Sequence, residues 1–240
     1  MARPRYPAKS AEAPLPLPPV SRTVGQVVAE AIKLYQGRWA ASLALGLPVA
    51  VVDQVIADQP LEVRIAALVV ASPAFSLAYA GAAAIRQDES PPLRIWVTAV
   101  AVGVVTFLPA AVLFAWFAIL AILWLGLAGH AVPAVMAERL GPVAALRRTL
   151  ALGRADYVHA AGSFATLAIV FGLTRLALGL VLSSQADATM RVAIFLADLV
   201  VSPILYLGAA IVYVDLVARI GLSRDERRTL RRDALQRTRT

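Results

Sequence analysis

The chain of 240 residues contains no cysteine and only two histidines. A disulfide, a thiolate metal site, an iron–sulfur cluster and a thiol nucleophile are therefore excluded. Charged residues are also scarce, at 16%, whereas soluble domains carry about 25%. The sequence holds no Walker loop, GxSxG elbow or HExxH motif. These shortages predict a protein that is not an enzyme and that binds neither a cofactor nor a metal.

Hydrophobic residues are correspondingly abundant, at 60%, and the mean hydropathy is +0.73. Soluble domains are about 45 to 50% apolar, so this chain carries more apolar surface than one water-soluble core can bury. The composition predicts an integral membrane protein. The formal net charge of +8 does not indicate nucleic-acid binding, because that requires a water-exposed basic face on a soluble fold.

Six stretches have the length and apolar character that a membrane-spanning helix needs, which is about 20 residues for about 30 Å of hydrocarbon. They run over residues 39–57, 63–85, 95–113, 115–137, 157–182 and 192–217. The third and fourth come from one uncharged run, which we divide near Pro109 to Phe114 because proline interrupts helical hydrogen bonding. The predicted fold is all-α, a polytopic bundle of six transmembrane helices.

Shorter segments surround the six spans. Residues 1–20 hold six prolines and no long apolar run, which predicts a disordered basic tail rather than a signal peptide. Apolar residues at helical spacing predict interfacial amphipathic helices at 22–37 and 142–154. The expected organisation is therefore a tail, a membrane domain over 21–218 and a basic cytoplasmic C-terminal helix over 219–240.

The distribution of lysine and arginine predicts the orientation. With both termini inside, inner segments hold 20 of the 23 basic residues, and the outer loops hold only Arg64 and Arg191. Because basic residues near helix ends stay on the cytoplasmic side, both termini are expected there. Most of the basic residues are arginine, which is typical of a GC-rich bacterium, so we expect a multi-pass protein of the plasma membrane. Its basic face also favours the anionic lipids of the inner leaflet as partners.

The helix expected at 142–154 carries Val143, Leu146 and Leu150 on one face, flanked by arginines. Such a helix lies flat at a membrane surface, with its apolar residues at the acyl boundary and its arginines among the phosphates. We therefore expect this part of the cytoplasmic face to bind lipid phosphates or a protein partner. The residues predicted to make those contacts are Arg147, Arg148 and Arg154.

The sequence around this helix resembles a known family. A Pro-Ala-hydrophobic segment ends near Glu138, and a Gly-Pro start leads into Ala-Leu-Arg147-Arg148-Thr149. This pattern is similar to the membrane domain found beside bacterial glycerophosphoryl diester phosphodiesterases and to its stand-alone six-helix relatives, in which Ser often takes the place of Thr149. The resemblance covers roughly Arg22 to Val217 and implies an architecture. The catalytic barrel has no counterpart here, because no region is polar enough and nothing carries its acid–base chemistry.

Charged side chains inside spans are costly and are candidate functional groups. Arg175 and Asp198 fall at matching depth on consecutive antiparallel spans, which predicts an intramembrane ion pair. The pair either offsets two burial costs, or Arg175 forms a site for an anion or headgroup, or both groups reach the interface. Asp53 is expected at the outer interface, near the end of the first span.

Two further sets of residues call for an interpretation. His130, His159 and Asp215 would have to converge to bind a metal or relay a proton, and their spacing matches no ligand motif, so hydrogen-bonded or interfacial histidines are expected. Small residues recur every four positions on the second span, which predicts a close helix contact within the molecule or, alternatively, a dimer contact. The stripe consists of Ser72, Ser76, Ala80 and Ala84.

These features favour a non-enzymatic membrane scaffold or accessory protein that organises lipid or a partner at the inner leaflet. The alternative is a small transporter or channel for an anionic or lipid-derived solute, with Arg175 in its path. A third interpretation is a supporting role for a phosphodiesterase or lipid enzyme encoded elsewhere. The sequence leaves the solute, the partner and the oligomeric state open.

Overall fold

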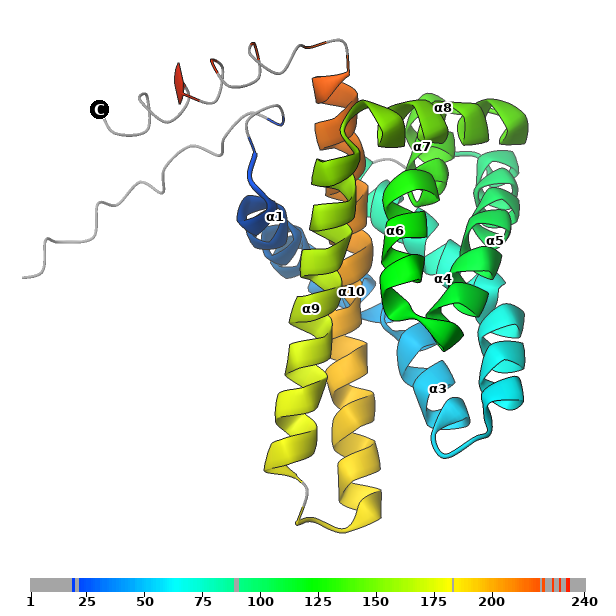
Figure 1. Ribbon diagram of the computed structural model, residues 1–240, viewed down its shortest axis with the longest axis vertical. Coiled ribbons are helices and arrows are strands. Elements are labelled where there is room, and N and C mark those ends of the chain that lie inside the picture. Colours follow the sequence, from blue (N-terminus) through cyan, green and yellow to red (C-terminus); the bar gives the residue numbers. More distant parts are fainter. Residues whose placement is uncertain are drawn as a thin grey trace, which may run out of the picture.

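The computed structural model describes residues 22–88, 91–182 and 184–220, with a few single residues outside these ranges. Every regular element within them is helical, which confirms the predicted all-α fold (Figure 1). The predicted tail over 1–20 and the C-terminal helix after residue 220 lie almost entirely outside the described residues. The helices are α1 Val24–Gly37, α2 Trp39–Ala44, α3 Leu47–Ile56, α4 Leu61–Gln87, α5 Leu93–Trp116, α6 Ala118–Ala128, α7 Ala131–Glu138, α8 Pro142–Ala155, α9 Tyr157–Val181 and α10 Asp187–Arg219.

In the part of the chain that the structure describes, six helical stretches are long and apolar enough to cross a membrane. They correspond to α2 with α3, to α4, to α5, to α6 with α7, to α9 and to α10, so each predicted span has a helical counterpart. The protein is therefore a multi-pass integral membrane protein. The predicted helices at 22–37 and 142–154 are present as α1 and α8.

The first span is two helices rather than the single helix expected, because the chain breaks between α2 and α3 at Leu45 and Gly46. Pro48 lies in the first turn of α3, where proline is tolerated. A Cβ atom at Gly46 would lie 2.2 Å from the carbonyl oxygen of Leu199 in α10. The break thus lets the backbone of the first span approach the backbone of α10 closely.

The boundary between the third and fourth spans differs from the prediction. The run is divided into two spans as predicted, but helix α5 continues through Pro109 to Trp116, and the turn falls at Phe117, a little after the expected position. A neighbouring helix stabilises the region of the proline, since Trp124 Nε1 donates a hydrogen bond of 2.8 Å to the carbonyl of Thr106. Proline is tolerated inside spanning helices where neighbours satisfy nearby carbonyl groups.

The small-residue stripe lies between helices of the same chain. Ser72, Ser76 and Ala80 are buried on α4. A Cβ atom at Gly103 of α5 would lie 2.5 Å from both Cβ and Oγ of Ser76. The stripe therefore serves the contact between α4 and α5, and Ala84 packs partly buried against the same core.

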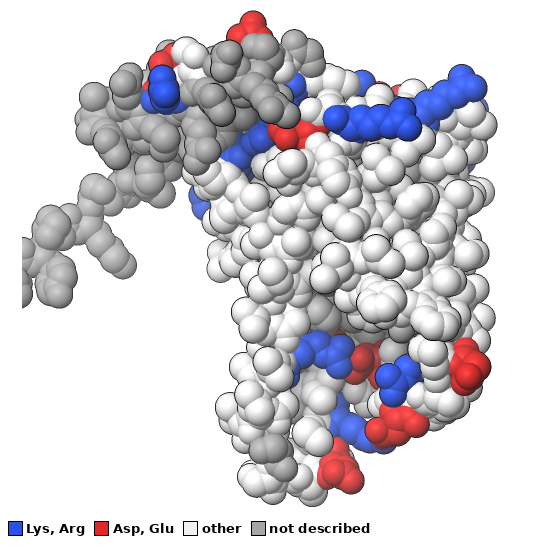
Figure 2. Space-filling view, in the orientation of Figure 1, with Lys and Arg blue, Asp and Glu red and all other residues white. Residues whose placement is uncertain are grey.

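The two ends of the bundle are chemically different from its middle. Helix α8 lies across one end, which we call the α8 end; the loops after α3 and α9 lie at the other, which we call the loop end (Figure 1). In the space-filling view, charged side chains gather toward the two ends and an uncharged band separates them (Figure 2). Such a band is the surface that lipid tails cover.

Candidate functional site

Helix α8 is firmly seated on the bundle. It begins at Pro142, and its buried side chains include Ala145, Thr149 and Leu152. A Cβ atom at Gly153 would lie 2.7 Å from the carbonyl oxygen of Leu127 in α6, so the two backbones are in close contact. The helix is therefore a fixed platform for the side chains on its outer face.

The buried face of α8 differs from the apolar face read from the sequence. Val143 is 63% exposed, and Leu146 and Leu150 are only partly buried. The bundle instead contacts the neighbouring face, where smaller side chains allow a closer approach of the helix. Val143 consequently points away from the protein, toward the surroundings of the bundle.

The three arginines predicted to bind phosphate have different environments. Arg148 Nε donates a hydrogen bond of 2.9 Å to Oε1 of Glu138, and the Tyr213 hydroxyl donates one of 2.7 Å to the same oxygen. Arg148 thus links α8 to α7 and α10. Arg147 and Arg154 are exposed, and neither forms an ion pair within the described part of the chain. Two of the three arginines are therefore available to an external anion.

A buried charged cluster lies beneath this surface at the α8 end. Arg22 Nη1 is 2.5 Å from Oδ1 of Asp215, and the two residues are 6% and 0% exposed. Arg219 donates one hydrogen bond of 2.7 Å to the carbonyl of Arg22 and another of 3.2 Å to Asp156. The cluster fastens the segment before α1 to α9 and α10. The sequence offered no spacing that would have paired Arg22 with Asp215.

The two histidines do not assemble a metal site with their neighbours. His159 Nε2 is 3.8 Å from Oδ2 of Asp215. His130 is fully buried and its ring lies 5.5 Å from that of Phe164. Among the described residues, no group of three or more His, Cys, Asp or Glu side chains is placed to hold a metal ion.

A second charged cluster, the loop-end triad, consists of Asp53 on α3, Arg175 on α9 and Asp198 on α10. Arg175 Nη2 donates a hydrogen bond of 2.8 Å to Oδ2 of Asp53, and Arg175 Nε lies 3.5 Å from Oδ1 of Asp198. The contact expected between Arg175 and Asp198 is therefore present. Asp53, which we expected only at the interface, is the closer partner of the arginine.

Helix geometry gives the depth of this triad. At 1.5 Å per residue, Arg175 lies about 27 Å along α9 from Tyr157, and Asp198 about 32 Å along α10 from Arg219. The hydrocarbon layer of a bilayer is about 30 Å thick. The loop-end triad and the buried cluster at the α8 end are thus separated by about one hydrocarbon thickness. Beside the triad, Arg191 pairs with Asp58 at 2.7 Å.

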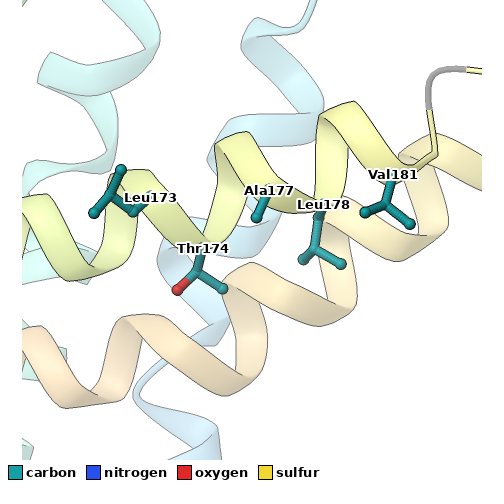
Figure 3. Close-up of a pocket in the computed structure, with 5 residues that line it drawn as sticks. All are labelled: Leu173, Thr174, Ala177, Leu178 and Val181. Atoms are coloured by element: carbon teal, nitrogen blue, oxygen red, sulfur yellow. The ribbon is translucent and has the colours of Figure 1, made fainter.

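The hollow near the triad is apolar. It lies on the half of α9 nearer the loop end and is lined by Leu173, Thr174, Ala177, Leu178 and Val181 (Figure 3). The one hydroxyl in this lining, on Thr174, already donates a hydrogen bond of 2.8 Å to the carbonyl of Val170. The lining therefore suits a hydrocarbon chain and offers no charge to an anionic solute.

Comparison with known proteins returned no match to a family model, a curated protein or a solved structure. The functional interpretation therefore rests on the chemistry of the chain's own residues. Two features are candidates for a functional site: the arginine-bearing face of α8 and the loop-end triad.

Proposed function

We propose that the protein is a non-enzymatic scaffold or accessory protein of a bacterial plasma membrane, and that it organises anionic lipid or an acidic partner at its α8 end. The observation that carries this proposal is the pair of exposed arginines on α8, Arg147 and Arg154, on a helix fixed to the bundle. Guanidinium groups bind phosphate oxygens in a bidentate manner. The backbone of this helix is already fixed to the bundle, so little backbone freedom is lost on binding.

The proposed orientation places the α8 end in the cytoplasm. Most of the basic residues in the described part of the chain flank the spans on this side, and basic residues flanking spans stay on the cytoplasmic side. The cytoplasmic leaflet is rich in anionic lipids, and each basic residue near its surface contributes about 1 kcal/mol of attraction. The resemblance to the phosphodiesterase-associated membrane domain supports the same interpretation, since it implies an architecture without the catalytic barrel.

The rival function, transport of an anionic solute past Arg175, receives less support. Two carboxyl groups surround this single guanidinium, so the triad carries a net charge of −1 when all three groups are ionised and of zero when one carboxyl group is protonated. A site without net positive charge does not attract an anion. The adjacent hollow is apolar as well. Solute flux through proteoliposomes that is abolished by Arg175→Ala, with the fold retained, would restore this rival.

The first test is the charge reversal Arg147→Glu. The purified protein is reconstituted in nanodiscs of phosphatidylglycerol and phosphatidylcholine, and the lipids that remain bound are counted by native mass spectrometry. Loss of about 1 kcal/mol predicts a decrease of about fivefold or more in the retained anionic lipid relative to the zwitterionic lipid. The same change at Arg154 is expected to act in the same direction.

The matched control is Arg64→Glu, an equal charge reversal at an exposed arginine of the loop end. The bound-lipid ratio should be nearly unchanged in this variant. Equal losses in Arg147→Glu and Arg64→Glu, or no loss in Arg147→Glu, would show that α8 holds no headgroup site.

A further inference from the structure

The loop-end triad leaves one carboxyl group without a hydrogen-bond donor. Arg175 donates to Asp53 at 2.8 Å, but its nearest nitrogen to Asp198 lies at 3.5 Å, beyond the usual N–H···O range of about 2.7 to 3.2 Å. Asp198 is 0% exposed, and neither of its carboxyl oxygens accepts a hydrogen bond from a described residue. A buried ionised carboxylate in this condition is strongly disfavoured.

The carboxyl group of Asp53 offers Asp198 a hydrogen-bond partner. Asp53 and Asp198 approach the same guanidinium group, at 2.8 Å and 3.5 Å, so the two carboxyl groups lie close together. Two ionised carboxylates offer each other only acceptors, whereas a protonated carboxyl group donates one hydrogen bond. One proton on Asp198 would therefore satisfy both side chains and bring the net charge of the triad from −1 to zero.

We propose that the loop-end triad is a proton-binding site, in which Asp198 takes up one proton at mildly acidic pH and shares it with Asp53 while Arg175 balances the remaining negative charge. Release of this proton places two like charges side by side between α3 and α10. The adjacent residue, Leu199, presents its carbonyl to Gly46 at the break between α2 and α3. The site of proton release therefore adjoins the close approach of Gly46 to the backbone of α10.

Among the described residues around the triad, no other charged group balances Asp198. Within α2 there is no charged residue, and Glu62 and Arg64, near the start of α4, are exposed. The pair of Arg191 and Asp58 lies nearer the loop and is neutral as a unit. The protonation of Asp198 therefore depends on Asp53 and Arg175.

The test uses infrared spectroscopy of the full chain in lipid nanodiscs. A protonated buried carboxyl group has a carbonyl-stretch band distinct from that of an ionised carboxylate, and we expect such a band from the triad at mildly acidic pH. Asp198→Asn should remove it because the group itself is lost. Asp53→Asn should also remove it, because the remaining carboxylate then balances Arg175 one to one. The matched control Asp58→Asn changes an exposed aspartate and should leave the band intact.

Two outcomes would overturn the proposal: a wild-type protein without the band at mildly acidic pH, or a band that persists in Asp198→Asn. A band lost in Asp198→Asn but kept in Asp53→Asn would overturn the sharing of the proton. If a variant fails to fold, the wild-type chain labelled with ¹³C-carboxyl aspartate is titrated instead. The buried band should then disappear as the pH is raised, and a band that does not change with pH would exclude the site.

Discussion

Arg147 and Arg148 are neighbours in the sequence, yet the fold gives them different environments. Arg148 points to Glu138, whose carboxylate also accepts a hydrogen bond from Tyr213, while Arg147 is exposed. A helix turns by 100° per residue, so adjacent side chains cannot share one face. The pair of arginines read from the sequence as one phosphate-binding unit is therefore divided between stabilising the fold and binding an external anion.

This division predicts that the two charge reversals differ in stability. Arg148→Glu removes a charge-assisted hydrogen bond and places like charges beside each other, and because both groups are about 30% exposed the expected loss is only about 1 to 2 kcal/mol. Arg147→Glu should lie within about 0.5 kcal/mol of the wild type. Denaturation in detergent, followed by circular dichroism, measures both. Equal destabilisation would contradict the assignment of Arg148 to the fold.

The contact between Arg175 and Asp198 could be anticipated because the rise per residue fixes depth along two consecutive helices. The contact with Asp53 could not, since it depends on how the broken first span packs against α10. The partner of Arg22 could not be predicted either, because Arg22 precedes α1 and its position follows from tertiary packing. Local spacing predicts partners within a hairpin and is silent on partners from distant segments.

Among the helices, the break between α2 and α3 makes a specific demand on its glycine. In Gly46→Ala the new Cβ would lie 2.2 Å from the Leu199 carbonyl oxygen, which belongs to the backbone and cannot move aside as a flexible side chain could. Overpacking of this kind costs about 1 to 3 kcal/mol. The variant should therefore show a lower midpoint of thermal unfolding than the wild type.

Gly162→Ala is the matched control, because a Cβ at Gly162 of α9 meets no atom within 4 Å. This change should be neutral or stabilising by up to about 1 kcal/mol, since alanine favours a helix more than glycine does. If both alanine variants have the same unfolding midpoint, the close approach at Gly46 makes no contribution to stability.

The first residues of the helices were predictable where proline or glycine precedes them. Pro60 precedes α4, Pro92 precedes α5 and Gly141 precedes α8, and the predicted elements begin within a few residues of these positions. The interior of the uncharged run from the third to the fourth span gave no such signal. The turn at Phe117 is set by helix packing, so the position of the only proline in α5 did not predict where the turn falls.

For the molecule as a whole, the proposed orientation can be tested because the chain has no cysteine of its own. Arg64→Cys at the loop end should react with a membrane-impermeant maleimide in intact bacterial cells. Arg147→Cys at the α8 end should react only after the membrane is permeabilised, because this end is expected in the cytoplasm. The reverse pattern of labelling would overturn the orientation and the proposed inner-leaflet partner together.

The hairpin of α9 and α10 reaches well beyond the turn between α5 and α6 (Figure 1). Past Arg175, Leu176, Leu180 and Val181 are 58%, 68% and 75% exposed, so the projecting part of α9 is still apolar. An apolar surface of unequal height around one protein is accommodated by tilt of its helices or by a local change in bilayer thickness. Long acyl chains are therefore expected to gather beside α9.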